Sequence, residues 1–173
     1  MNTKKLILMT VFVLFLSVGK LYAGNLQFKD GKFTIMHVTD LHTDYPIDKT
    51  VMGFIADSLD RIKPDLVVLG GDIATGPKET KYQEIKDICS LFTDRKIRFS
   101  LVFGNHDCEH GYTNEELLQM YKKAGEGFCL AYDAVPSLTG CGNHRLSILS
   151  SDGNKVAMDL WMLDSGSYIQ NSS

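Results

Sequence analysis

Three short polar segments carry side chains that could bind metal ions. They are Asp40-Leu41-His42, Gly70-Gly71-Asp72 and Gly104-Asn105-His106-Asp107. Each follows an apolar run, and two of them begin with glycine, which lets the backbone approach a ligand closely. Carboxylate, imidazole and amide oxygen donors together suit a divalent or trivalent metal ion of borderline hardness. These residue types therefore predict a metal site.

A pair of metal ions would give this site a specific chemistry. The two oxygens of one carboxylate can bridge ions roughly 3.5–4 Å apart, and such two-metal sites favour hydrolysis at phosphorus. The water between the ions loses a proton readily, and the ions neutralise charge on the phosphate oxygens. Each segment alone is a weak signal, because Asp-x-His is common and Gly-Gly-Asp is more often a turn. All three in this order, each ending a buried strand, favour the metal site.

Alternating strands and helices must position these segments. Apolar runs predict strands buried on both faces, and apolar residues at helical spacing predict amphipathic helices. The strands cover residues 33–39, 65–69 and 97–103, and the helices cover residues 49–63, 79–94 and 113–125. This order predicts an α/β fold with a parallel sheet and right-handed crossovers. Ligands gather at the carboxyl ends of such strands, where the three polar segments lie.

The chain changes character after residue 125. Residues 128–134, 145–149 and 155–163 are predicted strands, and Asp152-Gly153 is a hairpin turn signal between the last two. There are no repeats or low-complexity tracts. One domain over residues 24–173 is expected.

The first 23 residues are predicted to be a cleaved signal peptide. Lys4 and Lys5 precede an apolar run over residues 6–16, and the small residue Ala23 ends the segment. The run is shorter than the roughly 20 residues that span a bilayer, so no stable membrane anchor is expected. The protein is therefore expected to be exported, either periplasmic or secreted.

Removing residues 1–23 makes the chain acidic. It takes away three of the 18 basic residues and none of the 21 acidic residues, which leaves a formal charge of −6. Because sequence-independent binding to nucleic acid relies on clustered Lys and Arg, no nucleic-acid partner is expected. The charge also disfavours an extracellular nuclease.

Four cysteines follow the signal segment: Cys89, Cys108, Cys129 and Cys141. An oxidising compartment permits disulfides, and four cysteines allow three connectivities. Cys129 with Cys141 would close a short loop and is the pair to test first. Cys89 fits a buried helix position, and no spacing indicates a structural zinc site.

The three polar segments resemble the first signature blocks of the calcineurin-like metallophosphoesterases, which include purple acid phosphatases. The resemblance covers residues 33–107, and residues 140–143 and 161–166 resemble segments of purple-acid-phosphatase-like members. It implies a four-layer αββα sandwich, incomplete at the C-terminus. It also implies hydrolysis of a small phosphate ester at a dinuclear centre of Fe, Zn or Mn ions, with a phosphomonoester slightly favoured over a phosphodiester.

The resemblance also assigns roles to particular residues. Asp40 and His42 would bind the first metal ion, Asp72 would bridge both ions, and Asn105 would bind the second. His106 would stabilise the transition state or protonate the leaving group. Asp107 would orient the His106 ring.

The sequence departs from the family pattern in one respect. Family members carry a lone histidine and a Gly-His-x-His segment downstream, and no segment of this sequence fits either. Missing ligands weaken metal binding, so the chain is expected to be a poor catalyst on its own. The alternative function is therefore a truncated, weak or inactive protein that binds phosphate or metal.

Other residues have plainer expected roles. His37 is expected to be a hydrogen-bonded core residue, His110 an exposed loop residue, and His144 the start of a strand rather than a ligand. Trp161 is expected in the core, and Asp164 in a turn or cap.

Overall fold

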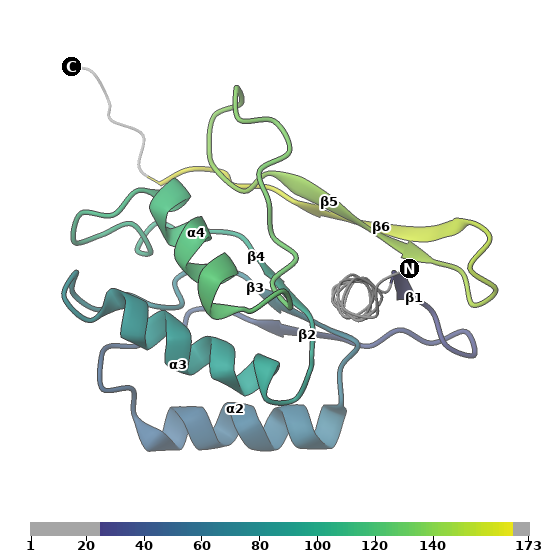
Figure 1. Ribbon diagram of the computed structural model, residues 1–173, viewed down its shortest axis with the longest axis horizontal. Coiled ribbons are helices and arrows are strands. Elements are labelled where there is room, and N and C mark those ends of the chain that lie inside the picture. The colour runs from purple at the N-terminus through teal and green to yellow at the C-terminus, as the bar shows by residue number, and fades with distance from the viewer. Residues whose placement is uncertain (1–24, 168–173) are drawn as a thin grey trace, which may run out of the picture.

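The computed structural model describes residues 25–167, which form three helices and two three-stranded sheets (Figure 1). The strands are β1 (Leu26–Gln27), β2 (Ile35–Val38), β3 (Leu66–Leu69), β4 (Phe99–Leu101), β5 (His144–Leu149) and β6 (Val156–Met162), and the helices are α2 (Lys49–Ile62), α3 (Lys81–Thr93) and α4 (Asn114–Ala124). The expected signal peptide, residues 1–23, lies outside the described part of the chain. Within that part, no helix is long and apolar enough to cross a membrane.

The first sheet has the order β2-β3-β4, and all its strands are parallel. Helix α2 connects β2 to β3, and α3 connects β3 to β4, as the alternating pattern predicted. All three predicted helices are present, with bounds within two residues of those expected. The predicted α/β class is confirmed.

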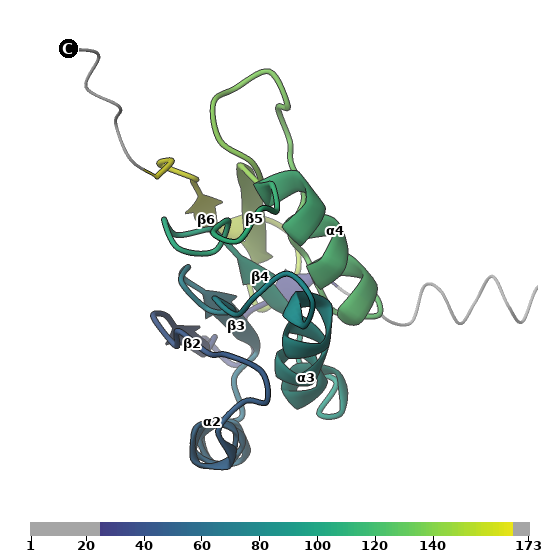
Figure 2. The same ribbon diagram turned by 90° about the vertical axis from the view of Figure 1, so that its left-hand side faces the viewer.

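Successive residues of β3 face two different layers. Val67 and Leu69 pack in the core with the three helices, whereas Leu66 and Val68 pack against the second sheet. In Figure 2, α2 and α3 lie on the side of β2–β4 away from β5 and β6. Because the side chains of a strand alternate between faces, the apolar run of β3 serves both cores.

The second sheet has the order β1-β5-β6, with β1 parallel and β6 antiparallel to β5. The inner residues of β5, such as Leu146 and Ile148, are buried, whereas Trp161 on β6 is 65% exposed and stacks with Arg145 on the outer face. No described helix covers this outer face. The described residues therefore form one layer of helices and two layers of sheet, which is consistent with part of the αββα sandwich.

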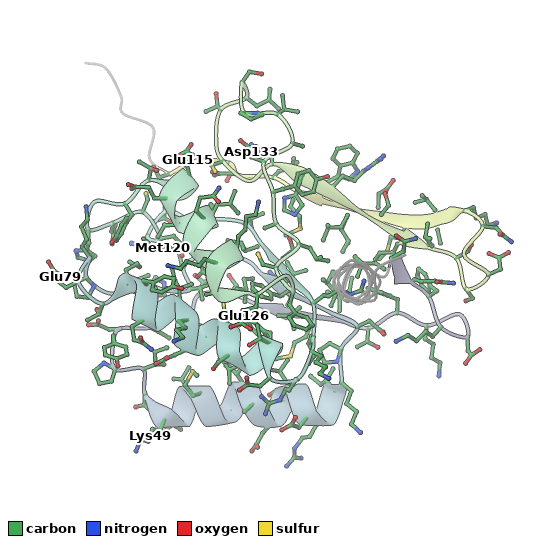
Figure 3. The ribbon with its side chains drawn as sticks, in the orientation of Figure 1. Lys49, Glu79, Glu115, Met120, Glu126 and Asp133 are labelled. Carbon is green, nitrogen blue, oxygen red and sulfur yellow. The ribbon has the colours of Figure 1, made fainter. Side chains whose placement is uncertain are left out.

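Local signals fix the helix ends. Asp48 caps α2 through the N–H of Thr50, and Lys63 ends it in the left-handed conformation just before Pro64. Thr113 and Glu116 form the predicted capping box of α4. Figure 3 labels Glu115, which lies in the first turn of α4. Its negative charge there stabilises the helix by interacting with the positive end of the helix dipole.

Three sequence predictions about packing are wrong. Residues 128–134 do not form a strand, because only Cys129 pairs with β4, at Phe99, before the chain turns away. His37 is exposed rather than buried, since β2 lies at the sheet edge and is not covered on both faces. Trp161 lies on the uncovered outer face of β6 and not in the core.

Candidate metal centre

Two of the polar segments continue the parallel pairing of β2 and β3 beyond the strand ends. The N–H of Asp40 donates to Gly71 O (3.1 Å), and the N–H of His42 donates to Asp72 O (3.0 Å). Thr43 then forms an isolated parallel bridge with Ala74. Backbone hydrogen bonds therefore set the alignment of the two loops.

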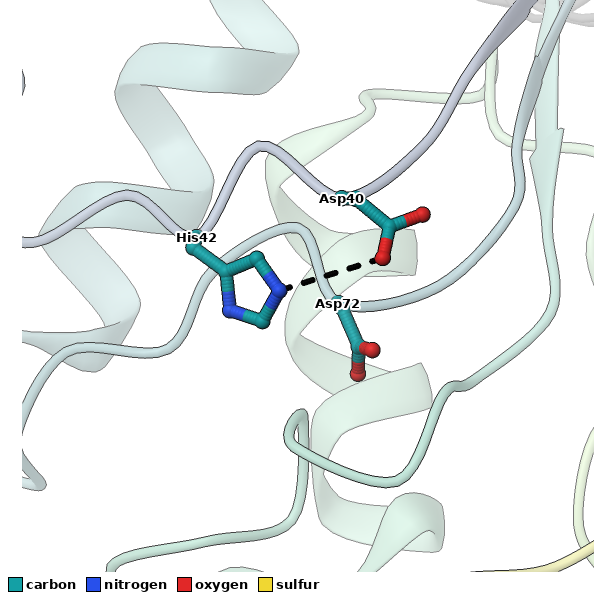
Figure 4. A group of neighbouring side chains, drawn as sticks. All are labelled: Asp40, His42 and Asp72. Atoms are coloured by element: carbon teal, nitrogen blue, oxygen red, sulfur yellow. Dashed lines mark ion pairs between the residues drawn. The ribbon is translucent and has the colours of Figure 1, made fainter.

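Three predicted ligands meet where these loops run side by side. The ligand atoms of Asp40, His42 and Asp72 all lie within 4.8 Å of one another (Figure 4). His42 Nε2 is 3.8 Å from Asp40 Oδ1, and these two side chains are 46% and 63% exposed. Asp72 is only 8% exposed. Two carboxylates and one imidazole thus face one point from the protein side.

All three residues adopt positive φ angles. The values are 55° for Asp40, 44° for His42 and 53° for Asp72. The left-handed region costs an L-residue roughly 1–2 kcal/mol, and such strain concentrates at functional sites. The loop hydrogen bonds hold the strained conformations and direct the three side chains together.

Gly104 packs directly against Asp72. A Cβ atom at residue 104 would lie 2.3 Å from Asp72 Oδ1 and 2.9 Å from Asp72 N. This contact explains the glycine that precedes Asn105, and it places the Asn105-His106 loop beside the other two. Asn105 is half-buried in that loop.

Asp107 lies beneath the site and holds two loops together. Its carboxylate accepts the N–H groups of Asp72 (2.7 Å), Ile73 (3.1 Å) and Gly104 (2.8 Å). Burial raises the pKa of this carboxyl, while the three N–H groups act in the opposite direction. The expected contact with the His106 ring is not among its hydrogen bonds.

Glu109 takes the place expected for Asp107. Its Oε1 lies 2.9 Å from Nδ1 of His106, while the N–H of His106 donates to Asp72 Oδ1 (2.8 Å). The rings of His106 and His42 pack edge to face with centroids 5.2 Å apart. Sequence reasoning missed Glu109, although its position three residues after His106 in an acidic loop was a usable signal.

His144 is buried and plays a structural part, as expected. Its ring bonds Ser100 Oγ (2.7 Å) and Gly142 O (2.6 Å), which links β5 to β4 of the other sheet. Asp164 accepts the N–H groups of Cys141 and Gly166, which confirms a turn role.

Cys129 and Cys141, the pair to test first for a disulfide, are not bonded to each other, and all four cysteines are free thiols in the described residues. The two have different surroundings, because Cys129 pairs with β4 and the backbone of Cys141 bonds Asp164. Burial raises the pKa of each of these thiols to about 11.

The sequence model of one protein family, calcineurin-like phosphoesterase, matches residues 33–168. The chain belongs to this family. The resemblance drawn from the three polar segments is therefore confirmed. The match also includes α4, β5 and β6, well beyond the segments that carry the motifs.

Several curated family relatives are similar over most of the chain. "Phosphatase DCR2" of Saccharomyces cerevisiae is 29% identical over 80% of this chain and 28% of its own length. "Probable inactive purple acid phosphatase 14" of Arabidopsis thaliana is 28% identical over 80% of this chain and 41% of its own length. The chain thus spans less than half the length of the relatives it matches. A search of solved structures found no significant match.

Proposed function

We propose that this chain takes part in metal-dependent hydrolysis of phosphate esters at a dinuclear centre. The observation that carries the proposal is the convergence of Asp40, His42 and Asp72 at the carboxyl ends of β2 and β3. Two bound ions of Fe, Zn or Mn would supply an activated water and neutralise the phosphate charge. Membership of the phosphoesterase family supports the reaction class.

The residues divide between the two ions in this proposal. Asp40 and His42 would hold the first ion, Asp72 would help to hold both, and Asn105 would hold the second. The buried position of Asp72 between the other two loops supports the bridging role. Asp107 acts indirectly, by holding the backbone at Asp72 and Gly104.

His106 donates a proton to the leaving oxygen of the ester in this scheme. If Nδ1 donates to Glu109, a proton on Nε2 of the doubly protonated ring is the one that can be transferred, and its loss leaves the neutral ring still bonded to Glu109. The contact between the His106 and His42 rings supports this role, since it places His106 next to a metal ligand.

An apolar groove beside Asp40 offers room for the organic part of the ester. It runs between β2 and α2 and is lined by Leu41, Val51 and Phe54, the last of which is 72% exposed. A phosphomonoester with a hydrophobic alcohol would place its phosphate at the ion that Asp40 would hold and its alcohol in the groove.

A second candidate function is binding of metal or phosphate without turnover. Three relatives similar over 80–82% of this chain are named probable inactive purple acid phosphatases, which favours this candidate.

One experiment separates the two candidates. The chain from Gly24 is loaded with Zn²⁺, Mn²⁺ or Fe³⁺, the metal content is measured, and hydrolysis of p-nitrophenyl phosphate and bis(p-nitrophenyl) phosphate is followed. Asp72→Asn is the test variant, and Asp57→Asn, exposed on α2, is the matched control.

The hydrolase proposal expects two ions per chain and turnover that Asp72→Asn reduces at least about 100-fold, since loss of the bridging carboxylate disrupts both ion sites. Metal binding without turnover would establish the second candidate. Absence of both would contradict each of them. Export from the cytoplasm stays a prediction, tested by N-terminal sequencing of the protein recovered from outside the cell.

A further inference from the structure

Two charged residues at the start of α3 are completely buried. Lys81 and Glu84 both have 0% exposure and lie one helical turn apart. Lysine and glutamate are almost never fully buried unless their charged groups have partners. Here the partners lie in the loops that carry the metal ligands.

Each charged group reaches one of these loops. Lys81 Nζ donates to Ala74 O (2.6 Å), two residues after Asp72. Glu84 accepts the hydroxyl of Thr43 at Oε1 (2.6 Å) and the N–H of Gly76 at Oε2 (3.2 Å). Helix α3 therefore contacts the loop after β2 and the loop after β3 at the same time.

Thr43 is the point where the two loops are joined. It follows His42 directly, its N–H donates to Ile73 O (3.0 Å), and its carbonyl accepts the N–H of Thr75 (3.1 Å). Its hydroxyl lies 2.6 Å from Glu84 and 3.0 Å from Ile73 O. Any shift of this side chain would move His42 relative to Asp72.

We propose that Thr43, Glu84 and Lys81 are positioning residues that hold the His42 and Asp72 loops in register before metal binds. The inference rests on the proposed metal-dependent function. The set touches neither metal nor substrate, and it acts through the backbone on either side of the ligands. A preorganised ligand set binds metal more tightly because less of the loop must be ordered on binding.

Stability alone does not account for this arrangement. Apolar side chains of similar volume would fill the same space without burying charge, and such replacements are often neutral or stabilising. Burial lowers the pKa of Lys81, and four carboxylates favour its charged form, those of Glu84, Asp107, Asp44 and Glu109. Directional hydrogen bonds of this kind fix one loop geometry where apolar packing would permit several.

The test compares Thr43→Val with Thr43→Ser. Valine keeps the volume and removes the hydroxyl, whereas serine restores the hydroxyl. Two measurements are made on the chain from Gly24: Zn²⁺ affinity with the metal ion alone, and hydrogen exchange of the His42, Thr43 and Thr75 amides without metal.

The expected result is about a tenfold loss of Zn²⁺ affinity and faster exchange of these amides in Thr43→Val, with both restored in Thr43→Ser. Glu84→Gln, which keeps the shape of the side chain, should act like Thr43→Val. Ile88→Val, at a buried position on the same helix, should lower stability and leave zinc affinity unchanged.

Wild-type zinc affinity and wild-type loop exchange in a folded Thr43→Val protein would overturn the positioning role. Should the unaltered chain bind no Zn²⁺, Mn²⁺ or Fe³⁺, the proposed function fails and the exchange measurement alone decides the positioning role. Unchanged exchange in Thr43→Val and Glu84→Gln would then reject it.

Discussion

Gly104 leaves no room for a side chain beside Asp72. Because a Cβ atom there would lie 2.3 Å from Asp72 Oδ1, Gly104→Ala must displace the carboxylate or the loop. We expect metal affinity to fall by about tenfold or more, as for other disturbances of groups that orient a ligand, measured by titration with Zn²⁺.

A helix glycine provides the control for this variant. Gly53 lies within α2 and has open space around its Cβ position, so Gly53→Ala should leave zinc affinity unchanged and raise stability by about 0.5–1 kcal/mol. Equal zinc affinity of Gly104→Ala and the unaltered chain would refute the steric argument.

Glu109 orients His106 and should matter for turnover more than for binding. Glu109→Ala removes the partner of Nδ1, so the ring loses its fixed direction. We expect kcat to fall about tenfold, a part of the roughly 10²–10⁴-fold contribution of general acid catalysis, with metal content and KM nearly unchanged. Glu126→Ala, at an exposed position beyond α4, is the control. A loss of metal with unchanged turnover per bound ion would contradict this role.

Among individual residues, the sequence predicted which candidate ligands lie together better than it predicted the residues that hold them in place. Asp40, His42 and Asp72 follow strand ends, and strand order alone brings them to one edge. The partners of Asp107 and Glu109 depend on loop conformation, which residue types do not specify. A buried carboxylate that bonds backbone N–H groups therefore could not be told from one that orients a histidine ring.

The capping box at the start of α4 should contribute to the stability of the protein. Thr113→Ala leaves the N–H of Glu116 without its side-chain acceptor and should lower the free energy of unfolding by about 1 kcal/mol, measured with urea. Thr113→Ser keeps the hydroxyl and should stay close to the unaltered chain. Equal losses in both variants would show that the hydroxyl is not the stabilising group.

Elements with a strong periodic pattern of apolar residues could be predicted from the sequence. Elements whose structure depends on pairing with another strand could not. Helix α2 has an apolar stripe and clear caps, so its expected bounds agree with the structure to one residue. The segment 128–134 is as apolar as a strand, but only Cys129 meets a partner strand. Strand β1 has two residues, which is too short to show a pattern.

For the whole molecule, His144 links the two sheets and makes stability depend on pH. Burial lowers the pKa of this imidazole from its ordinary value of 6.5, so the folded protein favours the neutral ring. The contribution of His144 to the free energy of unfolding is fully present at a pH above the pKa that this residue has in the unfolded chain. It decreases as the pH falls below 6.5, because the unfolded chain then binds the proton more readily.

The prediction compares unfolding free energies at pH 7.5 and pH 5.5. The unaltered chain should lose more stability between them than His144→Gln does, by at most about 1.4 kcal/mol per pH unit. His110→Gln, at an exposed loop position, should keep the full dependence. An identical pH dependence in His144→Gln would exclude this residue as its source.

The left-handed backbone at Asp40, His42 and Asp72 has an evolutionary consequence. Selection for folding alone would favour glycine at these positions, since glycine adopts this backbone without strain. A lineage that had stopped using metal could therefore gain stability by losing its ligands. Loss of metal use would therefore cost the fold least at these three positions.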